Sequence, residues 1–107
     1  MAREKILVID SDLDALSRIY LALIHRKFKV EACNNPEEMS ARFKRFKPSV
    51  IILELKEYTA ISKKLKIPAV VLVEKQDNSI TYLNDWDIQI QKPVHIEELM
   101  KAVEKLV

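Results

Sequence analysis

Short hydrophobic runs alternate with longer amphipathic stretches along the whole chain. Runs such as KILVID, SVIIL and AVVLV are apolar and rich in β-branched residues, which is typical of buried parallel strands. Behind Asp12, a typical N-cap residue, apolar residues recur at helical spacing instead and predict a helix with one buried face. The residues of this predicted face are Leu13, Leu16, Ile19, Tyr20, Leu23 and Ile24.

The same pattern predicts a regular alternation of strands and helices. Strands are expected at 5–10, 28–33, 49–53, 69–73 and 87–91. Helices are expected at 13–27, 36–46, 56–66, 77–84 and 96–107, of which those at 56–66 and 77–84 are short. This order predicts one α/β domain over residues 1–107, a doubly wound (βα)5 fold with a five-stranded parallel sheet of the flavodoxin-like class.

Composition narrows the class of protein. The chain has 107 residues and a single cysteine, Cys33, so no internal disulfide is expected. It has no N-terminal signal pattern and no apolar run near the roughly 18–20 residues that span a bilayer, so we expect a cytoplasmic protein without a membrane segment. With 18 basic and 16 acidic residues, the charge is too balanced to indicate direct nucleic-acid binding. Glycine is absent, so turns with positive φ fall to Asn, Asp or Lys.

Polar residues follow the predicted strands at their carboxyl ends. In a parallel sheet these ends meet at one edge, where function collects. We therefore expect an acidic cluster with one lysine at this edge. The residues placed there are Asp10, Ser11 and Asp12 after the first strand, Glu54 after the third, Val73 and Glu74 after the fourth, and Lys92 before Pro93 after the fifth.

The segments KILVIDSD, PSVIILEL, IPAVVLV and QKPVHIEEL, in that order, resemble the landmarks of the response-regulator receiver (CheY-like) domain over essentially the whole chain. In that family two adjacent acids after the first strand and an aspartate ending the third hold Mg²⁺. The aspartate accepts a phosphoryl group, which a hydroxyl on the fourth strand and a lysine on the fifth contact. The resemblance matches Asp10 to the first acid and Lys92 to the lysine, and it implies a cis bond between Lys92 and Pro93.

Four positions depart from the family pattern. Ser11 replaces the second acid, which weakens Mg²⁺ binding, and Val73 replaces the Thr or Ser of the fourth strand. Gln89 replaces the aromatic switch residue of the fifth strand, so both moving parts of the family's switch are missing. Glu54 replaces the phosphoacceptor aspartate, and its extra methylene moves the carboxylate outward by roughly 1 Å, enough to cost about a hundredfold in an oriented reaction. Its permanent charge near Lys92 imitates the phosphorylated state in part, so we expect one fixed conformation.

These departures favour an atypical or pseudo-receiver domain, a phosphorylation-independent signalling module that binds proteins and is not an enzyme. No cofactor is expected in this hypothesis. The alternative is a functional two-component receiver that a histidine kinase phosphorylates, with Asp10, Asp12 and Glu54 holding Mg²⁺. The sequence does not decide whether Asp12 is a magnesium ligand or the N-cap of the first helix. Catalytic turnover ranks last, because the sequence lacks a nucleophile paired with a base, a metal-ligand set and a phosphate-binding glycine loop.

A purely structural interpretation of the cluster is an ion-pair network of Asp10, Glu54 and Lys92 that orders the loops. It competes with a bound cation or a protein partner that contacts Glu54. His25 and His95 are expected on the surface, because neither has a second ligand beside it in the sequence.

Three further features bear on partners. The basic stretch 42–47 contains two phenylalanines at helical spacing, which we expect in the core and not against nucleic acid. Trp86 is open between a plug over the short helix at 77–84 and an exposed contact. The short helices at 56–66 and 77–84 are expected to leave part of one face of the sheet uncovered. The apolar patch exposed there would bind a protein partner or a second copy of the chain. Since the chain ends directly after the last helix, an output domain C-terminal to it is also expected.

Overall fold

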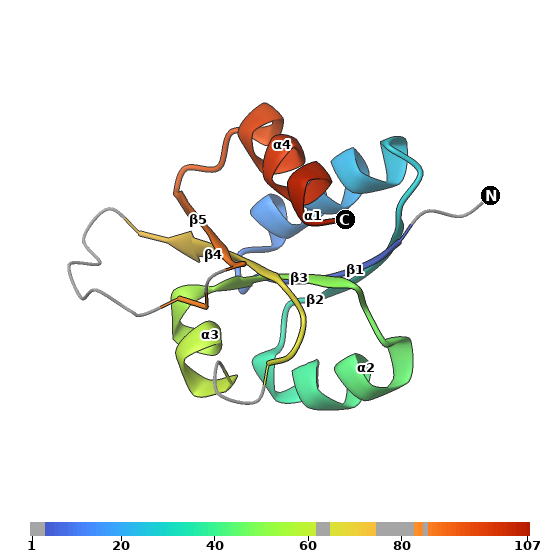
Figure 1. Ribbon diagram of the computed structural model, residues 1–107, viewed down its shortest axis with the longest axis vertical. Coiled ribbons are helices and arrows are strands. Elements are labelled where there is room, and N and C mark those ends of the chain that lie inside the picture. The colour runs from blue at the N-terminus through green and yellow to red at the C-terminus, as the bar shows by residue number, and fades with distance from the viewer. Residues whose placement is uncertain (1–3, 62–64, 75–82, 85) are drawn as a thin grey trace.

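The computed structural model describes residues 4–61, 65–74, 83–84 and 86–107 (Figure 1). Five parallel strands form one sheet in the order β2-β1-β3-β4-β5, which confirms the predicted flavodoxin-like class. The strands are β1 (Lys5–Ile9), β2 (Lys29–Cys33), β3 (Val50–Glu54), β4 (Ala69–Val73) and β5 (Ile88–Gln91).

Helices cover both faces of the sheet. Figure 1 shows α1 and α4 above it and α2 and α3 below it. The described helices are α1 (Leu13–His25), α2 (Met39–Phe46), α3 (Leu55–Ile61) and α4 (Ile96–Leu106). The helix predicted at 77–84 lies almost wholly outside the described residues. The helix predicted at 36–46 instead begins as a 3-10 turn, Pro36–Glu38, because the Asn35 side chain caps that tight turn by accepting a hydrogen bond from the Glu37 amide.

Asp12 is the N-cap of α1, one of the two roles that the sequence left open for it. Its Oδ1 accepts hydrogen bonds from the backbone amides of Asp14 at 3.0 Å and Ala15 at 3.5 Å. These are two of the amides that a helix leaves without a partner at its start, so the carboxylate fixes where α1 begins.

The predicted buried face of α1 is only partly right. Leu16, Ile19 and Leu23 are buried against the sheet, but Leu13 is 60% exposed and Ile24 is 40% exposed. At about 100° per residue, Leu13 and Ile24 lie on the side of the helix away from β1, so one sheet cannot bury all the apolar residues of α1.

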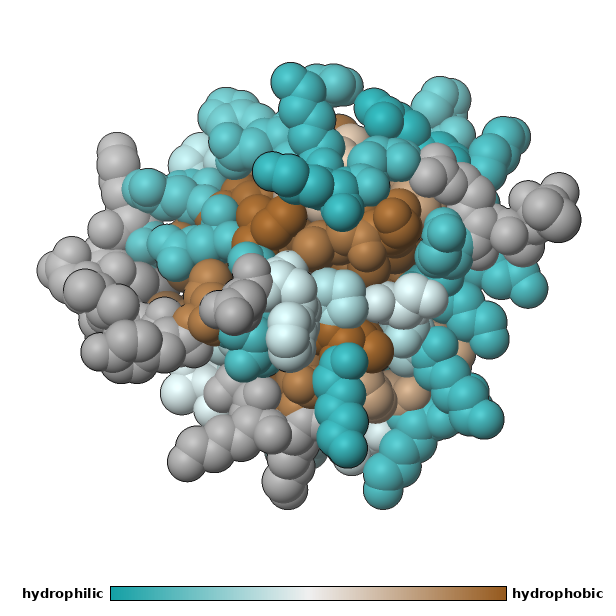
Figure 2. All heavy atoms as spheres, in the orientation of Figure 1, coloured by the Kyte–Doolittle hydropathy of each residue, from teal (hydrophilic) through white to brown (hydrophobic). Residues whose placement is uncertain are grey.

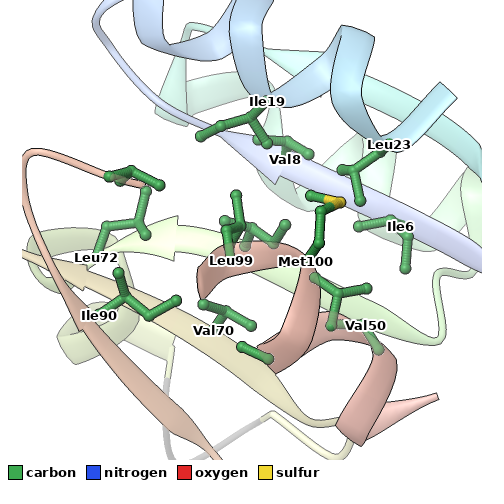
Figure 3. Close-up of a cluster of buried hydrophobic side chains, with 14 of the residues drawn as sticks. Ile6, Val8, Ile19, Leu23, Val50, Val70, Leu72, Ile90, Leu99 and Met100 are labelled. Carbon is green, nitrogen blue, oxygen red and sulfur yellow. The ribbon is translucent and has the colours of Figure 1, made fainter. Parts of the chain in front are cut away.

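The core consists of two layers, one on each face of the sheet. Figure 3 shows the layer between the sheet and the helices α1 and α4, where side chains of alternate strand positions meet those of both helices. Its labelled members are Ile6, Val8, Val50, Val70, Leu72 and Ile90 from the sheet, Ile19 and Leu23 from α1, and Leu99 and Met100 from α4. In Figure 2, hydrophilic residues cover the outer sides of the helices, and hydrophobic groups lie in a band between the two helix layers.

Lysines occupy the two left-handed positions of the described backbone. Lys27 follows α1 with φ 75°, and Lys47 follows α2 with φ 54°. A helix often ends in this conformation, usually at glycine. Because the chain has no glycine, lysine occupies this position at the end of both helices. Lysine is one of the three residue types, with Asn and Asp, that the composition predicted for turns with positive φ.

Below the sheet, Tyr58 connects α3 to the segment that leads into β5. Its buried hydroxyl donates to Asp87 Oδ2 at 2.6 Å and accepts from the Asn84 amide at 3.0 Å. Asp87 Oδ1 in turn accepts from the Ala69 amide at the start of β4 at 2.8 Å. Burial and the Asp87 carboxylate raise the pKa of Tyr58, so the hydroxyl keeps its proton and remains a donor.

Replacing Tyr58 by Phe tests this network. The substitution leaves the Asn84 amide and one oxygen of Asp87 without their partner, so we expect the free energy of unfolding to fall by about 1–3 kcal/mol. Urea denaturation measures it. Tyr20→Phe, the same chemical change on half-buried α1, is the control and is expected to cost less; equal losses would contradict a special role for the Tyr58 hydroxyl.

Candidate functional site

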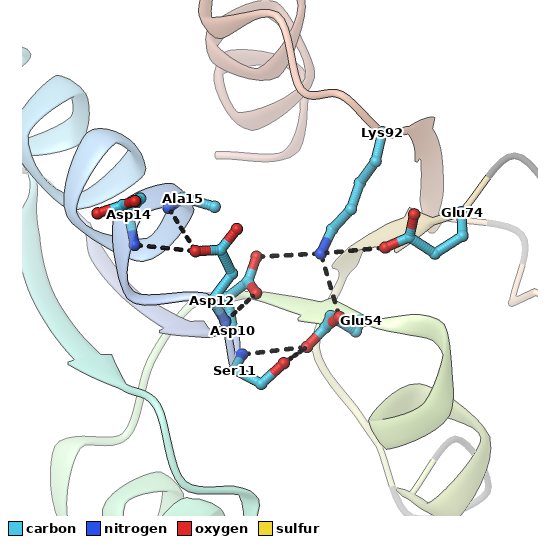
Figure 4. A network of polar contacts seen from close by, with 8 residues as sticks. All are labelled: Asp10, Ser11, Asp12, Asp14, Ala15, Glu54, Glu74 and Lys92. Carbon is cyan, nitrogen blue, oxygen red and sulfur yellow. Dashed lines mark hydrogen bonds and ion pairs between the residues drawn. The ribbon is translucent and has the colours of Figure 1, made fainter.

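The polar cluster lies at the carboxyl edge of the sheet, with Lys92 at its centre (Figure 4). The Lys92 ammonium is 3.1 Å from Glu54 Oε2, 3.4 Å from Asp10 Oδ2 and 3.6 Å from Glu74 Oε1. Asp10 is fully buried, whereas Glu74 is exposed. One cation therefore neutralises charge from the ends of three different strands.

Glu54, the last residue of β3, has both carboxylate oxygens engaged. Its Oε1 accepts hydrogen bonds from the Ser11 amide at 3.1 Å and the Ser11 hydroxyl at 3.0 Å. Its Oε2 accepts from Lys92. Ser11 thus holds Glu54 in place with two donors, of which a carboxylate side chain at position 11 would remove the hydroxyl and keep the amide.

Asp10 and Asp12 are joined through the backbone. Asp10 Oδ1 accepts from the Asp12 amide at 2.9 Å, while the Asp12 side chain caps α1. Asp10 Oδ2 is buried and has no hydrogen-bond partner among the described residues, so its contact is the ion pair with Lys92. On the other side of the cluster, the Lys92 amide donates to the Val73 carbonyl at 2.7 Å, and the Lys92–Pro93 bond is cis, as the resemblance implied.

Burial and charge act in opposite directions on these groups. Burial raises the pKa of Asp10, even though the Asp12 amide and Lys92 favour the ionised form. Burial also opposes ionisation of Glu54, but the hydrogen bonds from Ser11 and Lys92 outweigh it and lower the pKa of Glu54. The pKa of Lys92 is raised, because its carboxylate neighbours outweigh its own burial. Glu54 and Lys92 are therefore held as a charged pair.

The carboxylates of Asp10, Asp12 and Glu54 do not fit a magnesium site in this arrangement. Magnesium needs near-octahedral oxygen ligands. Here Asp12 is committed to the helix cap, Glu54 to Ser11 and Lys92, and Asp10 to Asp12 and Lys92. Among the described residues, no group of three His, Cys, Asp or Glu side chains is arranged to hold a metal ion.

The two positions that correspond to the family's switch lie apart from the cluster. The Val73 side chain is buried below the sheet in the core layer that contains Tyr58, and it carries no hydroxyl. Gln89 is exposed on β5, opposite Val71 in the register. Neither side chain contacts Glu54 or Lys92 among the hydrogen bonds and ion pairs of the described residues.

A pocket of about 510 Å³ opens above the cluster, between α1 and the start of α4. Glu54 and Lys92 form part of its wall together with Arg18, Glu74 and Pro93. Arg18 was not foreseen as a site residue, because its position within α1 gives no sequence signal of its orientation. Glu74 had a signal, since it directly follows a buried strand at the same edge.

The remaining candidate residues are placed as follows. His25 and His95 are exposed, as predicted, and the buried Cys33 thiol donates to the Asn35 carbonyl. Trp86 is 50% exposed, which favours an exposed position over a plug.

The two phenylalanines of the basic stretch are half-buried against the core below the sheet. An apolar groove of about 140 Å³, lined by Met39, Phe43, Ile61 and Leu65, lies between α2 and α3. The other part of the predicted apolar patch lies beside 77–84, a segment that is almost wholly outside the described residues. No helix in the described part of the chain is long and apolar enough to cross a membrane.

Comparison with protein-family models and with curated protein sequences gives no match. Solved structures are similar in shape: a response regulator receiver domain protein from Clostridium thermocellum has a TM-score of 0.82 at 21% identity, over 97% of this chain and 94% of that one. The chain has the receiver-domain fold. A response regulator from Desulfuromonas acetoxidans gives a TM-score of 0.77 at 20% identity, over 96% and 95% of the two chains.

A third receiver-type structure is the N-terminal domain of a response regulator/sensory box/GGDEF three-domain protein from Carboxydothermus hydrogenoformans. Its TM-score is 0.75 at 16% identity, over 94% of this chain and 91% of that one. At these levels of sequence identity, the similarity shows that the chains share a fold.

Replacing Lys92 by Met tests how far the cluster depends on its cation. The change leaves the fully buried Asp10 without its ion-pair partner, so we expect a loss of about 3–5 kcal/mol in the free energy of unfolding. The double variant Asp10→Asn/Lys92→Met is expected to recover part of the loss. Urea denaturation measures both, with Lys101→Met at an exposed position of α4 as the control; equal losses for Lys92 and Lys101 would refute the dependence.

The lowered pKa of Glu54 predicts a pH dependence. Because its pKa in the folded chain lies below the ordinary value of 4.5, ionised Glu54 stabilises the fold above that pH. This contribution is lost as the pH falls through the lowered value. The difference in unfolding free energy between the wild type and Glu54→Gln is therefore expected to shrink between about pH 6 and pH 3. A difference that stays constant in urea titrations over this range would contradict the assignment.

Proposed function

We propose that this chain is a phosphorylation-independent signalling or regulatory module, a pseudo-receiver that binds other proteins and is not an enzyme. The observation that carries the proposal is the closed set of contacts around Glu54. Both oxygens of its carboxylate accept hydrogen bonds, from Ser11 on one side and Lys92 on the other.

A phosphoacceptor carboxylate needs an oxygen free to attack a phosphorus atom, and neutralisation of the charge that develops there. Ser11 and Lys92 engage both oxygens of Glu54, and Lys92 is the cation beside it, with no magnesium site that fits among the described residues. Its lowered pKa keeps it ionised, and its ion pair with Lys92 takes the place of the contact that a phosphoryl group makes with the lysine in the family. These features support a module whose charge pattern is permanent.

The absence of a hydroxyl on Val73 and of an aromatic ring at Gln89 supports one fixed conformation. In the receiver family the β4 hydroxyl and the β5 aromatic residue move together on phosphorylation. Val73 is instead packed in the core, and Gln89 offers a polar, exposed side chain on the edge strand. We therefore propose that partners recognise a surface that does not change.

The partner is proposed to be a protein or a linked output domain. One of the similar structures is the N-terminal domain of a three-domain protein, and another is described as a response regulator receiver modulated diguanylate cyclase from Pelobacter carbinolicus. By analogy, an output domain would lie C-terminal to α4. A cytoplasmic location fits the one buried, unpaired cysteine of the chain.

Incubation with acetyl phosphate and Mg²⁺ tests the proposal, with intact-mass spectrometry as the measurement. The wild type is expected to gain no phosphoryl group. The variant Ser11→Asp/Glu54→Asp/Val73→Thr, which restores the second acid, the acceptor and the hydroxyl, is expected to gain one. An unrelated receiver domain with all three groups shows that the reagent is active, and a covalent phosphate on the wild type would overturn the proposal.

A further inference from the structure

Helix α1 carries a second apolar surface, turned away from the sheet. Leu13 is 60% exposed, Leu21 64% and Ile24 40%. Only Trp86 and Val107 are comparably exposed among the large hydrophobic residues of the described chain, so α1 holds most of this surface. Single exposed leucines are ordinary, but a concentration on one helix marks an interaction surface.

These side chains form one continuous stripe. With about 3.6 residues per turn, positions 13, 17, 20, 21 and 24 fall within roughly a 100° arc of the helix. We call Leu13, Ser17, Tyr20, Leu21 and Ile24 the outer stripe. It is turned by roughly 120° from the side that carries Leu16, Ile19 and Leu23, so the sheet leaves most of it uncovered.

A hollow of about 300 Å³ lies beside the outer stripe, where α1 meets the edge strand β2. Its walls are Leu16, Ser17, Tyr20 and Leu21 from the helix and Ala32 from β2. The side chains of Ser17 and Ala32 are small, so they leave a depression between the larger side chains around them. A protruding apolar side chain from another molecule can therefore enter beside the helix.

The charges at the two ends of α1 are of opposite sign. Asp12 and Asp14 stand at its beginning, and Lys27 follows its last turn, next to Arg26, which pairs with Glu97 of α4. A neighbouring α1 that runs antiparallel brings the acidic beginning of each helix toward the basic end of the other. A parallel neighbour brings like charges together, which is unfavourable.

The outer stripe is also nearly symmetric about its own middle, between positions 18 and 19. An antiparallel copy centred there sets Leu13 against Ile24 of the copy and Ser17 against Tyr20 of the copy. A two-fold interface requires this kind of self-complementary surface.

We propose that a second copy of this chain covers the outer stripe, with the two α1 helices packed antiparallel about a two-fold axis that crosses the stripe midway along the helix, between Ser17 and Tyr20. Leu21 of each copy enters the hollow beside the other helix. Glu54 and Lys92 take no part in this contact, so the dimer goes beyond the proposed function and stands or falls separately from it.

Sedimentation velocity of the wild type over a wide concentration range tests the dimer. We expect a reversible monomer–dimer equilibrium, which Leu21→Glu weakens by roughly 30-fold or more in the dissociation constant, as for a central interface residue. Ala60→Glu, the same added charge at an exposed position of α3, is the matched control and is expected to leave the dissociation constant unchanged. Circular dichroism of each variant shows that it is folded.

A charge exchange tests the antiparallel direction. Asp14→Lys and Lys27→Asp are each expected to weaken the dimer several-fold, and the double variant to restore it. A wild type that stays monomeric at every concentration, or that dimerises as well with Leu21→Glu, overturns the proposal. Failure of the double variant to restore association rejects the antiparallel arrangement.

Discussion

The structure depends on a single ammonium group shared among carboxylates at the carboxyl edge of the sheet. Asp10 is fully buried and Glu54 lies directly beside it, so without a cation the two charges would repel each other in a region poor in water. Lys92 reaches both from the end of β5, and its backbone amide is fixed to β4 through the Val73 carbonyl. The ends of β1, β3, β4 and β5 are thereby tied at one place. Glu54, Glu74 and Lys92 of this network form part of the wall of the pocket above it.

Much of this edge could be predicted from the sequence, because parallel strands bring their carboxyl ends together whatever their loops contain. Asp10, Glu54 and Lys92 therefore had to lie close to one another. The direction of short side chains could not be predicted in the same way. Asp12 suits a helix cap and a metal site equally by its spacing, and only the amides of Asp14 and its neighbour decide for the cap. From the sequence Ser11 is a missing ligand, whereas in the structure it is a hydrogen-bond donor to Glu54.

Two further features depend on how distant segments meet, which local pattern does not encode. The apolar residues of α1 form two stripes, and helical spacing alone cannot tell which of them the sheet buries. Leu13 and Ile24 belong to the stripe left outside. The hydrogen bond between Tyr58 and Asp87 joins residues 29 positions apart, and no local sequence pattern predicts it. Helical periodicity and strand order thus predict the layers well, and they predict poorly which polar groups connect them.

The lysines at the ends of α1 and α2 have a consequence for the unfolded chain. Lys27 and Lys47 adopt positive φ at a cost of about 1–2 kcal/mol each relative to ordinary helical or extended backbone. A glycine would relieve that strain, but it would also enlarge the set of conformations that the chain must give up on folding, by about 0.4–1 kcal/mol at each site. A sequence without glycine has no position at which the denatured chain gains this extra freedom. Part of the strain in the two turns is therefore offset by lower conformational entropy before the chain folds.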